Sequence, residues 1–277
     1  YIMDNFDYKK YIAEGKLLKE ASDKPKAIIL AGAPGAGKGY ILRGLDLSGL
    51  TTYNLDLDFV PLLKKAGVTL DLKNATPEER STSSKLMRQA ASKLKDEDLP
   101  KAIANRESFI LDGTGASSRA TLKLKDELEN AGYEVFMLYV YTDLERSLKQ
   151  NQDRFDKSGG EDRSLAPAIV MTTWNDVTQN YNEYKSSFGN NFVSVANTLK
   201  DEKLDNLEDI VDKYLTPYKP QGTKPKDAKA QARSDKRKAA INAQIKSLLS
   251  DDGVKDVIDN SVSAEEAQAK LKSFING

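Results

Sequence analysis

The feature that most constrains the fold is a glycine-rich segment between an apolar run and a helical stretch. The run AIILA at 27–31 has the length and apolar character of a buried strand. It is followed by Gly32, Ala33, Pro34, Gly35, Ala36, Gly37, Lys38 and Gly39, after which Tyr40 opens a helical pattern. Glycines allow the sharp turn that joins a strand to a helix. This order of elements predicts an α/β fold.

The rest of the chain alternates in the same way. Further strand candidates are YNL at 53–55, SFIL at 108–111, VFMLYV at 135–140 and FVSVA at 192–196. Helix-length stretches separate them, at Pro77–Asp98, Ser117–Ala131, Thr142–Arg154 and Pro167–Phe188. Right-handed crossovers between such strands give a three-layer α/β sandwich around a mostly parallel, five-stranded sheet.

Composition divides the chain into four parts. Residues 1–25 predict a lead-in helix, and residues 26–218 carry the alternating pattern of the main domain. Residues 219–238 are rich in Lys, Ala, Pro and Gln and are typical of a basic linker. Residues 239–277 predict a short helical tail with helices at 241–249 and 263–275. We expect this tail to be an accessory to the main domain.

The residue types that are missing exclude several kinds of chemistry. The chain has no Cys and no His, which rules out disulfides, thiolate nucleophiles, zinc clusters and imidazole bases. Lys plus Arg and Asp plus Glu both number 42, so any electrostatic function must be local. A bound metal would be a hard cation such as Mg²⁺. Without an apolar run of about 20 residues, we expect a cytoplasmic protein with no membrane partner.

The glycine-rich segment also predicts a binding site for the phosphates of ATP. Backbone N–H groups from Gly32 to Tyr40 can turn inward on a phosphate, and Lys38 can reach the β and γ oxygens. The strand before it and the helix after it are the context that the GxxxxGK pattern requires. Gly39 stands where a magnesium-binding Ser or Thr is usual. We therefore expect Mg²⁺ to be held through water and carboxylates.

Two acids follow strand candidates, at the edge where open α/β sheets bind ligands. Asp58 in YNLDLDF is the candidate general base, although it would equally suit the cap of a helix over 59–65. Asp112 in ILDGTG is a candidate to order a magnesium-bound water, and Thr114 a candidate to hold substrate. The alternative for this second segment is an Asp-Gly turn before a helix.

A charged segment, 150–167, predicts a lid. It places Arg154 and Arg163 on either side of Ser-Gly-Gly. Two guanidinium groups on such a segment could stabilise a phosphoryl group in transfer. The alternative is a solvated charged loop between helices.

Together these residues resemble the zeta toxin family of P-loop kinases over roughly Lys26 to Ser186. The resemblance rests on GAPGAGK, the second acid of LDLD, ILDGTG with Asp112 in place of the usual Glu, the two lid arginines, and AGYEVFMLYV. It implies Asp58 as the catalytic aspartate and UDP-N-acetylglucosamine as acceptor. Gly39 and Ala116 depart from the family pattern. YNLDLDF is also similar to a motif of polynucleotide 5′-hydroxyl kinases.

We therefore expect an enzyme, a kinase that uses ATP and Mg²⁺, with Lys38, Asp58, Arg154 and Arg163 as catalytic residues. Its acceptor would be a hydroxyl of a sugar nucleotide or of a nucleic-acid end. The basic linker, 219–238, would bind the phosphates of a nucleic acid. A nucleotide-dependent switch or NTPase without an acceptor is the alternative from another class. The sequence does not identify an antitoxin-like protein partner.

Overall fold

The structure is a computed structural model that describes residues 24–47, 49–198, 207, 210, 211, 225–250 and 252–276. The expected lead-in helix lies outside the described residues, apart from Lys24 and Pro25. No helix of the described part is long and apolar enough to cross a membrane.

Five parallel strands form one sheet in the order β2-β3-β1-β4-β5. They are β1 (Lys26–Ala31), β2 (Thr51–Asn54), β3 (Phe109–Asp112), β4 (Glu134–Tyr141) and β5 (Phe192–Ala196). Every residue of β1 is buried, as expected of a central strand covered on both faces. The prediction of a five-stranded α/β sandwich is confirmed, and within the described residues all of its strand pairs are parallel.

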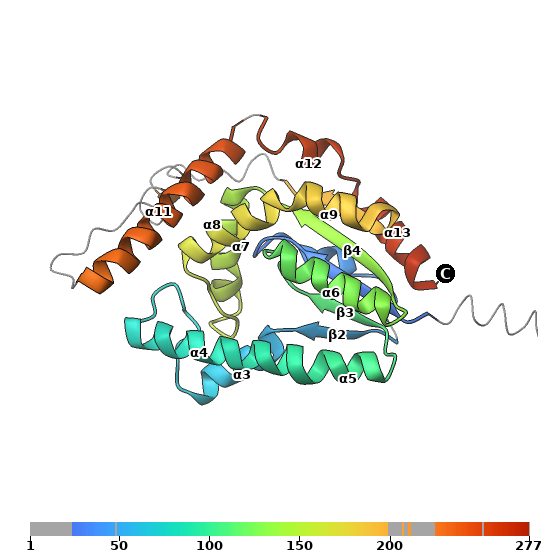
Figure 1. The fold of residues 1–277 in the computed structure, drawn as a ribbon, viewed down its shortest axis with the longest axis horizontal. Coiled ribbons are helices and arrows are strands. Elements are labelled where there is room, and N and C mark those ends of the chain that lie inside the picture. Colours follow the sequence, from blue (N-terminus) through green and yellow to red (C-terminus); the bar gives the residue numbers. More distant parts are fainter. Residues whose placement is uncertain are drawn as a thin grey trace, which may run out of the picture.

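Helices cover both faces of the sheet (Figure 1). Side chains of α6 (Ser118–Asn130), α8 (Pro167–Gln179) and α9 (Tyr181–Phe188) pack in one core cluster with alternate residues of β1 and β4. The opposite face packs on α2 (Lys38–Leu42) and α13 (Ala264–Asn276). The stretch Pro167–Phe188, predicted as one helix, forms two helices, α8 and α9, which meet at Asn180.

The C-terminal region differs from the expected linker and separate tail. Pro225 begins α11 (Pro225–Leu248), so most of the segment predicted as a linker, 219–238, is helical. Its Lys and Ala residues are strong helix formers. After α11 come α12 (Lys255–Asp259) and α13, which lies on α2, where the Gln268 amide nitrogen donates to the Ile41 carbonyl at 2.8 Å. Leu271 of α13 is completely buried. The helical tail thus completes the third layer.

A smaller apolar cluster lies beside the sheet, around α3 (Asp56–Lys65) and α4 (Pro77–Lys93). Phe59 and Leu63 of α3 fill its centre, and Phe155 of α7 (Leu144–Lys157) packs against it. A π-helical turn (Leu94–Asp98) and α5 (Leu99–Ala104) continue from α4 toward β3. This cluster supports the side of the molecule that faces the glycine-rich loop.

Candidate functional site

A cavity of about 1420 Å³ opens at the carboxyl edge of the sheet. Its first wall is the glycine-rich loop, from Pro34 to Tyr40. Its second wall comes from α3, α4, α7, α8 and the loop after α7. Ligands bind at this edge in open α/β sheets, and the volume is large enough for two substrates of nucleotide size, since single small-molecule sites span about 300–1000 Å³.

Side chains from distant parts of the chain fix the glycine-rich loop. Asn197, just after β5, donates its amide to the Ala36 carbonyl at 2.9 Å, and the Ser147 hydroxyl of α7 donates to the Pro34 carbonyl at 2.7 Å. Gly37 has a φ of 91°, and a Cβ there would lie 2.5 Å from the Asn197 amide nitrogen. Only glycine fits this position. Sequence analysis missed Ser147 and Asn197, because no local pattern marks either of them.

Lys38 lies at the base of the cavity. Its ammonium donates to the Gly32 carbonyl at 3.0 Å. Burial lowers the pKa of Lys38, and the positive charge of Arg154 adds to this, whereas the carboxylates of Asp112 and Asp56 oppose it. A buried cation on a glycine-rich loop between a strand and a helix is the arrangement expected for a phosphate site.

The two acids of LDLD lie in different places. The sequence predicted a strand end at Asp58, but β2 ends at Asn54 and α3 begins at Asp56, so Asp58 occupies the first turn of a helix. Its carboxylate pairs with Lys93 of α4 at 2.6 Å, outside the cavity. Asp56 lines the cavity instead. A helix turns each residue by about 100°, which separates side chains that a strand would keep on one face.

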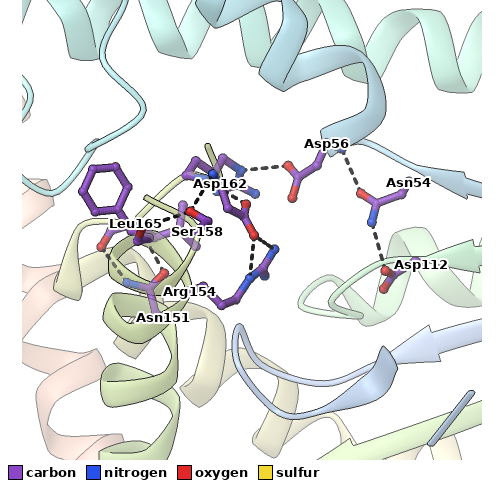
Figure 2. Close-up of polar contacts among 10 residues, drawn as sticks. Asn54, Asp56, Asp112, Asn151, Arg154, Ser158, Asp162 and Leu165 are labelled. Atoms are coloured by element: carbon purple, nitrogen blue, oxygen red, sulfur yellow. Dashed lines mark hydrogen bonds and ion pairs between the residues drawn. The ribbon is translucent and has the colours of Figure 1, made fainter. Parts of the chain in front are cut away.

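Asn54 explains why the strand stops there. Its side-chain oxygen accepts a hydrogen bond from the Asp56 amide at 2.8 Å, an Asx turn that redirects the backbone into α3. Its amide nitrogen donates to Asp112 at 2.9 Å. Asn54 and Asp112 are register partners on β2 and β3. One side chain therefore links the two acids of the cavity (Figure 2).

Asp162 links the two predicted arginines, Arg154 and Arg163, which are separated by eight residues in the sequence. Arg163 donates through Nε to Asp56 at 2.8 Å, and Arg154 donates through Nε and Nη2 to one oxygen of Asp162 at 2.9 and 2.6 Å. Asp162 also accepts from the Arg163 backbone N–H at 2.8 Å. Both arginines line the cavity, and Figure 2 shows Asp162 beside Arg154. Asp162 was not predicted.

The remaining predicted residues lie on the first wall or next to it. Thr114 lines the cavity, and its carbonyl accepts from the Gly32 amide at 2.9 Å. The loop after β3 is fixed by Tyr184, whose hydroxyl donates to the Gly115 carbonyl at 2.6 Å. Tyr40 is largely exposed at the cavity mouth, with the Arg43 guanidinium 5.4 Å from its ring centre.

Asp56 and Asp112 are the residues that suit Mg²⁺. Among the described residues no group of three or more His, Cys, Asp or Glu side chains forms a metal site. Two carboxylates on one cavity are nonetheless hard oxygen donors of the kind that share Mg²⁺ with water and phosphates. Gly39 offers no hydroxyl, and a Cβ there would meet nothing within 4 Å.

Several solved structures are similar to this chain. One comes from the PezAT chromosomal toxin-antitoxin system of Streptococcus pneumoniae, at 16% identity and a TM-score of 0.43, covering 87% of this chain and 99% of that one. A chain of the native AvrRxo1-ORF1:-ORF2 complex has 16% identity and a TM-score of 0.46, covering 96% of this chain and 90% of the other. A chain of the same complex with ATP has 15% identity and a TM-score of 0.47, covering 94% of this chain and 83% of the other.

Searches of curated protein sequences gave no match. The model of the zeta toxin family, by contrast, matches residues 10–206, which span the sheet, the glycine-rich loop and the loop between α7 and α8. The chain therefore belongs to the zeta toxin family.

Proposed function

We propose that this protein is an ATP-dependent kinase that transfers the γ-phosphoryl group of ATP to a hydroxyl of a small acceptor. The observation that carries this proposal is one cavity with the glycine-rich loop on one wall and Asp56, Arg154 and Arg163 on the other. Phosphoryl transfer requires this combination, since it depends on positioning and on charge stabilisation. A nucleotide switch does not require a second-substrate wall with an acid.

The triphosphate would lie in the glycine-rich loop, with Lys38 on its β and γ oxygens. Binding would give the buried ammonium a full counter-charge in place of the Gly32 carbonyl. Asp112 and Asp56 would hold Mg²⁺ through water. The ion would supply charge neutralisation on the phosphates.

In the chemical step, Asp56 would take the proton of the acceptor hydroxyl as its oxygen attacks the γ-phosphorus. The bond from that phosphorus to the bridging oxygen breaks, and ADP leaves. Asp56 suits this role better than Asp58, because Asp56 lines the cavity whereas Asp58 pairs with Lys93 outside it. Arg163, already bonded to Asp56, and Arg154 would stabilise the charge on the phosphoryl group.

The wall formed by α4 and α8 favours an anionic acceptor with an apolar or planar group. Arg80 lines the cavity and is oriented by two backbone carbonyls, at 2.9 Å from Ala75 and 3.1 Å from Lys73. Among the described residues, no carboxylate forms an ion pair with it. Met87 and Ile169 line the same cavity with 45% and 51% of their surfaces exposed. A sugar nucleotide such as UDP-N-acetylglucosamine would satisfy both the cation and the apolar groups.

A screen of acceptors with γ-labelled ATP tests the proposal. UDP-N-acetylglucosamine, N-acetylglucosamine and a DNA oligonucleotide with a free 5′-hydroxyl should be compared, with Lys38→Met as the inactive control. We expect label in the sugar nucleotide and little in the free sugar, which lacks the anion. Label in the DNA end would instead favour a role for the basic residues of α11. Release of phosphate without labelled acceptor, across a wider acceptor library, would contradict a kinase.

A further inference from the structure

We propose that Ser164 is a positioning residue for phosphoryl transfer, because it fixes Arg163 through a clasp with the loop between α3 and α4. The clasp consists of Ser164 with Leu70, Asp71 and Lys73. The inference rests on the proposed function, in which Arg163 contacts the moving phosphoryl group. It concerns how that arginine is held in place before nucleotide binds.

The clasp centres on a buried serine. The Ser164 hydroxyl donates to Asp71 at 2.7 Å and accepts from the Lys73 backbone N–H at 3.2 Å. The Ser164 backbone N–H donates to the Leu70 carbonyl at 3.0 Å, and Ser164 forms a parallel β-bridge with Asp71. The residue has no exposed surface, even though it belongs to a charged loop. A hydroxyl with both donor and acceptor partners in a buried site fixes the backbone at that point.

The other carboxylate oxygen of Asp71 also accepts a hydrogen bond. The Asn74 amide donates to its second oxygen at 2.7 Å. Burial works against the charged form of Asp71, but the hydrogen bonds from Ser164 and Asn74 outweigh it, so that the pKa of Asp71 is lowered. Asp71 therefore stays an acceptor at neutral pH, and the Ser164 hydroxyl keeps its direction.

A second pair of contacts fixes the next residue. Asn151 of α7 accepts from the Leu165 N–H at 3.1 Å and donates to the Leu165 carbonyl at 3.0 Å (Figure 2). Residues 164 and 165 are thus tied to two different elements, which leaves Arg163 little freedom to move. Its side chain already contacts Asp56. Arg154, in contrast, pairs with Asp162 of the lid loop itself and is about half exposed.

The two arginines therefore differ: Arg163 is oriented in advance, whereas Arg154 can adapt its position. Charge stabilisation is most effective when the donor is already oriented before the reaction, and misplacement by about 1 Å can cost about 10²-fold in rate. Loss of the Ser164 hydroxyl would loosen Arg163 without removing it. We therefore expect Ser164→Ala to lower kcat by roughly tenfold, part of that cost, and to leave ADP affinity unchanged.

A double-mutant cycle between Ser164→Ala and Arg163→Ala distinguishes positioning from a purely structural role. Two quantities should be measured in each protein: kcat with UDP-N-acetylglucosamine, and the preference for a non-hydrolysable ATP analogue over ADP in binding. The second reports contact with the γ-phosphate and needs no acceptor. Both should fall in Ser164→Ala, whereas adding Ser164→Ala to Arg163→Ala should change neither. Ser194→Ala, a buried serine of β5, serves as the matched control and should leave both unchanged.

Wild-type kcat and analogue preference in a folded Ser164→Ala protein would overturn the inference. An equal loss in the Arg163→Ala background would also overturn it, because Ser164 would then act on stability alone. If Ser164→Ala does not fold, Asp71→Ala, which removes the acceptor of the Ser164 hydroxyl, carries the same cycle. Failure of the wild-type protein to label any acceptor would count against the proposed function instead, while the analogue preference still tests the clasp.

Discussion

The two walls of the cavity are built differently. The first wall is a glycine-rich loop held by buried side chains, such as Ser147 at 0% exposure, and its Lys38 is buried. The second wall presents partly exposed side chains that pair with one another, including Arg154 with Asp162. Backbone donors suit a ligand part that is always the same, the triphosphate. Side chains suit the part that differs between enzymes, namely the acceptor.

Asp56→Asn should show the largest effect of any change to the second wall. The variant keeps the size of the side chain but removes the proton acceptor, so transfer should fall by about 10² to 10⁴-fold while ATP binding persists. Single-turnover transfer and ATP binding should be measured together.

Asp58→Asn is the matched control, two residues away. Its pair with Lys93 is partly exposed and screened by water, so transfer should stay near the wild-type rate. The reverse ranking of the two variants would restore Asp58 as the base and would contradict the assignment made from the cavity.

On the first wall, Lys38→Met should reduce transfer by at least about 10²-fold, the cost of losing one charge-stabilising group. The folded protein should nevertheless become more stable at neutral pH. Because burial lowers the pKa of Lys38, its charged form carries a folding cost at every pH below the lowered pKa. Chemical denaturation from pH 7 to 10.5 should show the gain of the variant shrinking as the wild-type lysine loses its proton. A less stable variant would mean that the ammonium holds the loop together.

The support of the first wall comes from the C-terminal helices, which Leu271→Ala tests. Leu271 is completely buried on the face that also covers α2. The variant should lower the free energy of unfolding by about 2–5 kcal/mol. Ile258→Ala on α12 is the control, because Ile258 is 41% exposed and should change stability by less than about 0.5 kcal/mol. Equal stability of the two variants would mean that the helical tail is an accessory after all.

Arg80→Gln separates acceptor binding from chemistry within the second wall. We expect the acceptor KM to rise about tenfold, typical of a lost charge-assisted hydrogen bond, with kcat and nucleotide affinity little changed. Arg88→Gln lies on the same helix but outside the cavity and provides the comparison. Steady-state kinetics with a charged and an uncharged acceptor would show whether Arg80 binds the anionic group of the acceptor. An unchanged KM would leave the acceptor wall without its proposed cation.

The same contrast between walls explains what could be predicted from the sequence. Local patterns sufficed for all five strands and for the glycine-rich loop, because strand period and glycine spacing are properties of neighbouring residues. The end of the strand was expected after Asn54, since LDLD alternates like a strand, but the Asx turn of Asn54 ends β2 there and places Asp56 on the cavity. Ser147, Asn197 and Ser164 act on partners more than 80 residues away. No local pattern could reveal such contacts.

The smallest expected effect concerns the missing hydroxyl of the first wall. Gly39 lies in α2, and a Cβ there would meet nothing within 4 Å, so Gly39→Ser should fold normally and gain a few tenths of a kcal/mol of helix stability. The new hydroxyl stands where P-loop proteins bind Mg²⁺, so the Mg²⁺ concentration for half-maximal transfer should fall by a few-fold. Gly37→Ser provides the opposite case in the same loop, because its Cβ would collide with Asn197, and nucleotide binding should be lost. A magnesium titration of Gly39→Ser identical to that of the wild type would show that the ion does not approach this position, leaving Asp56 and Asp112 as its protein contacts.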